Sequence, residues 1–124
     1  MSRHPKVPDA LHPITVTPTP GRVRILAGDQ VIADTTAALT LRESTYPPVQ
    51  YVPLADVDPA VLSATSTSTY CPFKGDASYY SVTTPSGTIA DAGWTYPEAY
   101  EAVADIRGHV AWYPDRVTVE VLDA

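Results

Sequence analysis

Apolar and polar positions alternate along much of the chain, and this pattern predicts β-strands. Residues 22–27 and 30–35 are rich in β-branched side chains. Gly28-Asp29 separates them, which is typical of a two-residue hairpin with glycine at the first turn position. Residues 37–42 continue as a third strand.

Two further hairpins are predicted towards the C-terminus. Residues 78–84 and 88–91 flank the turn sequence Pro85-Ser86-Gly87. Residues 109–113 and 116–122 flank Pro114-Asp115, and in the second of these segments valines alternate with polar residues. These segments make the chain mainly β.

Helix signals are fewer. Asp58 before Pro59 predicts a short capped helix, because aspartate accepts backbone N–H groups and proline fits the first turn. Residues 97–107 predict the clearer helix, with Gly108 at its C-terminal cap. The expected fold is a compact single domain, an antiparallel sheet or barrel-like assembly with one or two short helices.

Length and proline content set the domain organisation. The chain has 124 residues, the size of one domain, and 13 prolines, which favour short strands and ordered loops over long helices. Residues 1–20 hold five of these prolines and few charges, so they are predicted to form an extended arm. The β-rich domain is expected to span residues 21–124.

Charge and targeting signals limit the partners and the compartment. The net charge is −6 and no segment gathers Lys and Arg, which argues against nucleic acid and against anionic membranes as partners. The N-terminus has no continuous apolar stretch typical of a secretory signal. A single cysteine, Cys71, excludes an intrachain disulfide, and a cytoplasmic location is expected.

Six short blocks, in order, carry a resemblance to a known family. They are Leu41-Arg-Glu, Tyr46-Pro-Pro-Val, Asp56-Val, Cys71-Pro-Phe-Lys-Gly-Asp-Ala-Ser-Tyr, Trp94-Thr-Tyr-Pro and Trp112-Tyr. With these blocks the chain resembles the family called domain of unknown function 427 (DUF427) over about residues 21–122. The resemblance implies a small β-rich fold, often a stand-alone bacterial protein without an established activity. One departure is Tyr70, where family members usually carry histidine.

The family also carries a nucleotidyltransferase-like label, which the residues do not support. Asp56-Val-Asp58 offers paired carboxylates, but no glycine-rich phosphate loop precedes it, and Asp58 already has a role as a helix cap. A structural zinc site needs about four Cys or His ligands with paired spacing. Cys71 with His4, His12 and His109 does not provide that spacing, so neither a metal site nor a cofactor is expected.

Two candidates for chemistry lie in the segment that begins at Cys71. Cys71 is a nucleophile if a neighbour such as Lys74 or His109 lowers its pKa; otherwise it is a small buried apolar residue. The Lys74-Gly75-Asp76 turn is either an anion site, with an ammonium beside exposed N–H groups, or a solvated surface turn.

Charged residues at the end of a predicted strand add a third candidate. Arg42 can clamp a carboxylate or phosphate, or it can form an ion pair with Glu43 or Asp76 that fixes the loops. In the first case Glu43 or Asp76 serves as acid or base, or orients the cations. Catalytic candidates are therefore Lys74, Glu43, Asp76 and Cys71.

Aromatic residues complete the hypothesis. Ligand pockets are typically lined by apolar and aromatic side chains with a few placed polar groups, although a tyrosine-rich core is the alternative. We expect a small anionic metabolite to be bound by Arg42, Tyr46, Lys74, Tyr80, Trp94 and Tyr96. Strand alternation does not decide whether Tyr79 or Tyr80 faces the pocket. The rival hypothesis is a non-catalytic interaction module, in the form of a homodimer, with structural ion pairs.

Overall fold

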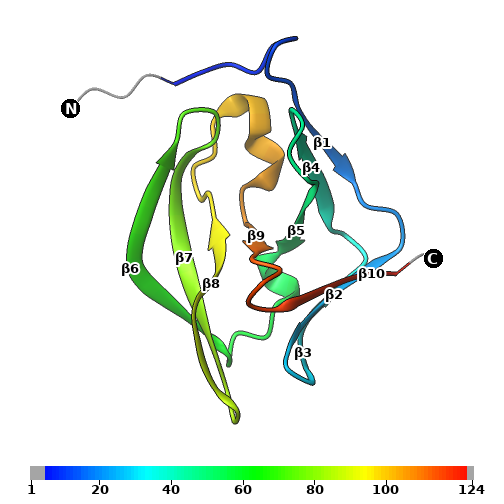
Figure 1. Cartoon of the computed structure of the whole chain (residues 1–124), viewed down its shortest axis with the longest axis vertical. Helices are drawn as coiled ribbons and strands as arrows, with labels where there is room; N and C mark the ends of the chain where they lie inside the picture. The colour runs from blue at the N-terminus through cyan, green and yellow to red at the C-terminus, as the bar shows by residue number, and fades with distance from the viewer. Residues whose placement is uncertain (1–4, 123–124) are drawn as a thin grey trace.

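The computed structural model describes residues 5–122 and is built almost entirely from strands (Figure 1). Two short 3-10 helices, η1 (Leu54–Asp56) and η2 (Glu101–Ile106), interrupt them. The strands are β1 (Ile14–Pro18), β2 (Arg22–Ala27), β3 (Gln30–Thr35), β4 (Leu39–Glu43), β5 (Val49–Pro53), β6 (Leu62–Cys71), β7 (Gly75–Thr84), β8 (Gly87–Thr95), β9 (His109–Trp112) and β10 (Thr118–Leu122). The mainly β class predicted from the sequence is confirmed.

The strands form two antiparallel sheets. The larger has seven strands in the order β1-β4-β5-β9-β8-β7-β6, and the smaller has three in the order β10-β2-β3. β1 and β6 are both edge strands, so the larger sheet stays open and is not closed into a barrel. β1 lies within residues 1–20, so the folded sheet begins inside the segment that was expected to be an arm.

Each face of the larger sheet covers its own core. On one face Val52, Val82 and Val110 pack with Val23 and Ile25 of the smaller sheet. We call this group the aliphatic cluster. The other face carries the aromatic cluster, whose buried members are Leu41, Tyr51, Ala77, Tyr79, Tyr96, Ala99, Val103, Ile106 and Ala111. Strand alternation explains the division, because neighbouring residues point to opposite faces.

Two of the predicted hairpins are confirmed. β2 and β3 pair through Ala27 and Gln30, and Gly28 has the positive φ, 60°, that its turn position requires. β7 and β8 pair through Thr84 and Gly87 across the expected turn. Both strands are longer than predicted.

The third predicted hairpin is wrong. β9 lies in the larger sheet between β5 and β8, whereas β10 pairs with β2 in the smaller one. The backbone N–H of Tyr113 donates to the Ala92 carbonyl, and Arg116 and Val117 donate to the Tyr113 carbonyl. This turn directs the chain away to the other sheet, and alternation along a strand does not reveal which strand it pairs with.

Both predicted helices also need correction. After Asp58 the chain makes a turn, in which the Asp58 carboxylate accepts the Ala60 N–H at 2.9 Å, and then enters the ten-residue strand β6. The predicted helix 97–107 shortens to η2, with a non-helical backbone at Val103. The N–H of Tyr100 donates to the Lys74 carbonyl at 3.0 Å, so a tertiary contact replaces the helical bond.

Candidate functional site

The turn after β6 places a lysine in the interior. Pro72, Phe73 and Lys74 connect Cys71 to Gly75, and the Lys74 N–H donates to the Cys71 carbonyl at 3.2 Å. Gly75 has φ of 110°, which residues with a side chain rarely adopt, so the chain reverses here without strain. As a result Lys74 is only 7% exposed.

The end of β4 brings a carboxylate to the same place. Glu43 shares a strand face with buried Leu41, whereas Arg42 between them is exposed on the alternate face. Ser44 follows with a positive φ of 48°, and its N–H donates to the Pro13 carbonyl at 2.8 Å. The strand therefore ends with Glu43 directed inward.

The third side chain at this place is His12, which lies in the segment before β1. We call this segment, residues 5–13, the leading segment. This segment crosses one end of the molecule (Figure 1). The Asp9 carboxylate accepts the N–H of His12 at 3.0 Å, and the His12 ring stacks on Phe73 with centroids 4.1 Å apart. The Lys6 N–H donates to the Pro72 carbonyl at 2.8 Å. The leading segment is thus bound to the turn that carries Lys74.

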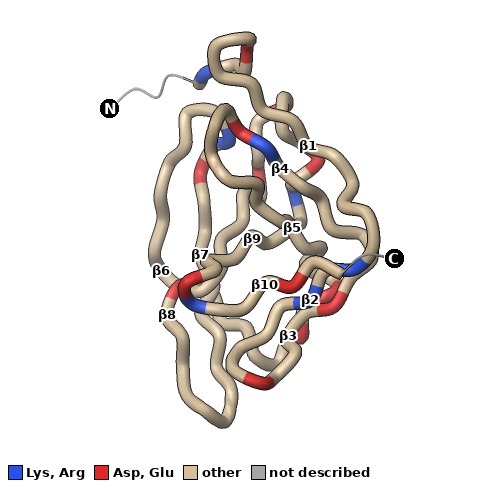
Figure 2. The backbone as a smooth tube through the Cα atoms, turned by 45° about the vertical axis from the view of Figure 1, so that its right-hand side comes forward, with Lys and Arg blue, Asp and Glu red and all other residues tan. Residues whose placement is uncertain are grey.

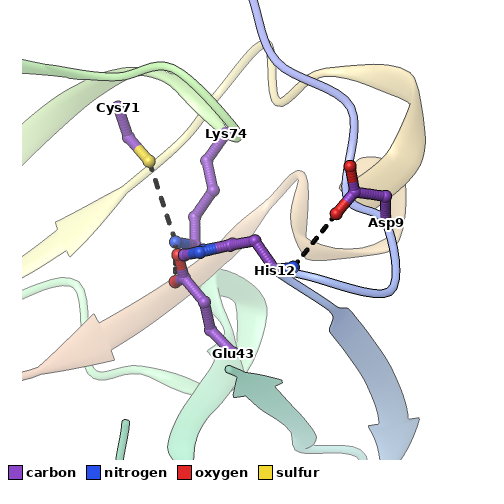
Figure 3. A network of polar contacts seen from close by, with 5 residues as sticks. All are labelled: Asp9, His12, Glu43, Cys71 and Lys74. Carbon is purple, nitrogen blue, oxygen red and sulfur yellow. Dashed lines mark hydrogen bonds and ion pairs between the residues drawn. The ribbon is translucent and has the colours of Figure 1, made fainter. Parts of the chain in front are cut away.

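These three side chains form one polar group, which we call the Glu43 cluster: His12, Glu43 and Lys74. The Lys74 Nζ lies 2.5 Å from Glu43 Oε1, and the His12 Nε2 lies 2.7 Å from Glu43 Oε2 (Figure 3). Burial by itself raises the pKa of Glu43, but the hydrogen bonds and charges of Lys74 and His12 together outweigh it and lower the pKa. Glu43 is therefore ionised at neutral pH.

Cys71 lies next to this cluster. Its Sγ is 3.8 Å from Lys74 Nζ (Figure 3). The residue is half-buried and packs against the aromatic cluster. Both interpretations of Cys71, as a small core residue and as a reactive thiol beside a cation, are compatible with this position.

A pocket of about 220 Å³ opens beside Glu43 and Lys74, and we call it the inner pocket. Its remaining walls are apolar or aromatic: Leu41, Tyr46, Pro47, Val49, Tyr51, Trp94 and Tyr96. Burial raises the pKa of Tyr51 and of Tyr96, so both phenols keep their protons and can act as hydrogen-bond donors. The pocket therefore combines one buried ion pair with neutral aromatic walls.

The structure brings together five of the residues predicted for a site: Glu43, Lys74, Tyr46, Trp94 and Tyr96. Sequence reasoning did not assign His12 to the site. Its partner Glu43 is 31 positions away, and neither a motif nor a periodic pattern links them. The register of β1 with β4, which pairs Ile14 with Glu43, and the stacking on Phe73 bring His12 near.

The four other predicted residues do not line the inner pocket: Cys71 lies beside the Glu43 cluster, and Arg42, Asp76 and Tyr80 lie elsewhere. Arg42 is exposed, and Asp76 is exposed on β7 opposite Tyr70. Tyr80 is half-buried against the aliphatic cluster, on the far face of the sheet. Its neighbour Tyr79 is buried in the aromatic cluster on the other face, but it does not line the inner pocket either.

The paired carboxylates Asp56 and Asp58 have structural partners. Asp56 accepts the Thr35 hydroxyl at 2.7 Å, and Asp58 shapes the turn before β6. Within residues 5–122, no group of three or more His, Cys, Asp or Glu side chains is arranged to hold a metal ion; His4 lies outside these residues. Lys and Arg are interspersed with Asp and Glu along the tube in Figure 2.

A family model described as a domain of unknown function (DUF427) matches residues 15–123. The chain belongs to the DUF427 family. A search among curated proteins finds no match. Glu43 and Lys74 lie inside the matched DUF427 region, whereas His12 precedes it, so the Glu43 cluster is completed from outside that region.

Two other features of this DUF427 domain bear on the sequence predictions. The Tyr70 hydroxyl, at the position where the resemblance implies a histidine, is hydrogen-bonded to the Tyr100 hydroxyl at 2.9 Å. In the part of the chain that the structure describes, no helix is long and apolar enough to cross a membrane.

Proposed function

We propose that this DUF427 domain binds a small anionic metabolite in the inner pocket, and that the Lys74 ammonium attracts its charge. One observation carries the proposal: a lysine side chain that is 9% exposed lines an aromatic pocket. A charged group is costly to bury unless it is paired, and buried ionisable groups in clefts are common at binding sites.

Glu43 does not remove the capacity of Lys74 to bind an anion. An ammonium has three N–H donors, and the contacts of Lys74 Nζ within residues 5–122 are with Glu43 and, at a longer distance, Cys71. Both oxygens of Glu43 are bound to cationic or ring N–H partners. Glu43 thus orients Lys74, and a further donor is left for a ligand. Arg42 is exposed, so the proposal rests on Lys74 alone.

The pocket favours a small ligand over the rival interaction module. A protein-binding surface of this kind would present its aromatic rings outward on a broad face. Tyr46, at 63% exposure, does so, but Tyr51 and Tyr96 are buried and Trp94 is half-buried. The inner pocket therefore fits a molecule that enters it better than a flat partner.

A thermal-shift screen tests this function. Sodium acetate, pyruvate, succinate, benzoate and phosphate are added to the wild type, to Lys74→Met and to Lys6→Met, which alters the other lysine of the chain. At about ten times Kd, binding adds about 1.4 kcal/mol to the free energy of unfolding and raises Tm by roughly 5 °C.

We expect at least one anion to stabilise the wild type and Lys6→Met, and none to stabilise Lys74→Met. Circular dichroism at the starting temperature checks that each variant is folded. If no anion raises the Tm of the wild type, or if Lys74→Met responds as the wild type does, the proposed function is wrong.

A further inference from the structure

A second hollow adjoins the inner pocket. It measures about 310 Å³, and we call it the outer groove. Tyr46, Pro47, Val49 and Trp94 line both hollows, so the two meet at these four residues. A ligand pocket usually measures about 300–1,000 Å³. The inner pocket alone is below this range, and the two together fall within it.

The outer groove lies where the larger sheet loses a strand pairing. β9 pairs with β5 only from Tyr51 to Pro53, and the two residues before Tyr51 have no partner in β9. Trp94 belongs to the aromatic side of the sheet and Trp112 to the aliphatic side, yet both line the groove. The groove is therefore lined from both faces of the sheet, at the gap between β5 and β9.

The walls of the outer groove differ from those of the inner pocket in charge. Its additional walls include Pro48, Trp112, Pro114 and Val119, and none of the residues that line it is charged. Gln50 also lines it, but its amide oxygen accepts from Thr19 and its nitrogen donates to Thr40, so its polar atoms already have partners. The groove thus offers mostly apolar surface.

We propose that the ligand of this domain is an amphipathic acid. Its carboxylate lies in the inner pocket near Lys74, and its hydrocarbon or aromatic body extends past Trp94 into the outer groove. This inference rests on the proposed function and specifies its substrate class. It is supported by the shared lining of the two hollows and by the change from an ion pair to apolar walls.

The construction of the groove suits a small hydrocarbon body. Prolines at 47, 48 and 114 have restricted backbones, so these walls are pre-organised and lose little freedom when a ligand binds. The groove's volume of about 310 Å³ lies within the range of small-molecule sites. The groove therefore fits part of a small molecule.

A chain-length series tests the inference. Isothermal titration calorimetry measures Kd for straight-chain carboxylates from acetate to decanoate on the full chain. Each buried methylene is expected to tighten binding roughly three- to fourfold until the groove is filled, after which Kd levels off. The matching methyl esters keep the hydrocarbon but lose the charge, and they should bind at least tenfold more weakly.

Two variants locate the hydrocarbon. Val119→Gln places a polar amide in the outer groove and should flatten the dependence of Kd on chain length while acetate binding stays unchanged. Val121→Gln makes the same substitution two residues along β10, at a position that is 50% exposed and outside both hollows. Val121→Gln should show the same dependence of Kd on chain length as the wild type. Changes in the fluorescence of Trp94 and Trp112, the two tryptophans of the chain, give a second readout on the wild type.

The outcomes separate this inference from the proposed function. If short acids bind through Lys74 but Kd does not change with chain length, the amphipathic ligand is wrong and the anion site stands. The inference is also overturned if Val119→Gln and Val121→Gln both show the same dependence of Kd on chain length as the wild type, or if the esters bind as well as the acids. If no acid binds but phosphate stabilises the wild type through Lys74, the inference fails and the anion site stands; if neither binds, both proposals fail.

Discussion

The two faces of the seven-stranded sheet bury side chains of different chemistry. The aliphatic cluster is built from residues such as Val52, Val82 and Val110, packed on Val23 and Ile25 of the smaller sheet, all fully buried. The aromatic cluster contains tyrosines instead, and the buried Lys74 and the half-buried Glu43 lie beside it. The same strands supply both clusters.

The difference indicates that one face of the sheet serves stability and the other serves binding. Apolar burial is the main favourable term in folding, and the aliphatic cluster provides it mainly through valine, isoleucine and alanine side chains. A buried ion pair adds little net stability, because desolvation offsets the attraction between the charges. We infer that the aliphatic face holds the fold together and that the aromatic face keeps the Glu43 cluster for binding.

The largest effect is expected on the aliphatic face. Ile25→Ala removes a fully buried side chain and leaves a cavity, so the free energy of unfolding should fall by about 4 kcal/mol, measured by urea denaturation. Val31→Ala, at an exposed position on β3, should change it by less than about 0.5 kcal/mol. The affinity of folded Ile25→Ala for ligand should equal that of the wild type. Weaker binding would show that the two faces are not separate in function.

The second largest loss of stability is expected when the ion pair between Lys74 and Glu43 is broken. Lys74→Met leaves the Glu43 carboxylate with only His12 as a partner among the residues that the structure describes, so we expect a loss of about 3 kcal/mol, at the lower end for a broken buried pair. The exposed Lys6→Met is the control and should be within about 0.5 kcal/mol of the wild type.

Removing both charges, of Lys74 and of Glu43, separates the stability of the ion pair from its role in binding. Combining Lys74→Met with Glu43→Leu should recover most of the lost stability, since apolar replacements of buried pairs are often neutral or better. Anion binding should stay absent in this double variant. A double variant that remains as unstable as Lys74→Met would mean that the pair itself stabilises the fold.

The fold was easier to predict than the site, for physical reasons. Hairpins such as β2–β3 depend on local alternation and on the turn at Gly28, and both are visible in the sequence. η2 shortened because the Tyr100 N–H bonds to the Lys74 carbonyl, a contact between distant segments. The pairing of β10 with β2 is equally non-local.

The candidate site was also predictable only as far as local sequence determines it. Glu43 and Lys74 were identifiable as candidates because they are charged residues at the end of a strand and in a turn. Their pairing at 2.5 Å, and the exposure of Arg42 beside Glu43, depend on which strand face is buried. His12 had no sequence signal, because it reaches Glu43 only after β1 has paired with β4.

Acid titration tests the electrostatics of the Glu43 cluster with a smaller effect. The pKa of Glu43 in the folded protein lies below its ordinary value of 4.5. A lowered carboxylate pKa stabilises the folded state fully above that ordinary value, and this contribution disappears as the pH falls through the folded-state pKa. The free energy of unfolding of the wild type should therefore decrease below about pH 4.5.

In Glu43→Gln that part of the acid dependence should be missing. Glu120→Gln removes a carboxylate from the surface pair with Arg24, which joins groups 2.9 Å apart, and controls for the loss of one charge. Urea denaturation between pH 3 and pH 7 measures all three proteins. A Glu43→Gln variant with the same acid dependence as the wild type would contradict the lowered pKa.

The smallest effect is expected at the leading segment. His12→Gln replaces the ring that stacks on Phe73 and bonds to Glu43, but the side chain is 29% exposed and Lys74 still pairs with Glu43. We expect a loss of about 1 kcal/mol, typical of one hydrogen bond, together with faster amide hydrogen exchange in residues 6–12. His109→Gln, which changes a histidine outside the cluster, should leave that exchange unchanged. If His12→Gln did not alter it, the backbone contacts to Pro72 and Ser44 would be enough to hold the leading segment, and the functional pair would be Glu43 and Lys74 without the histidine.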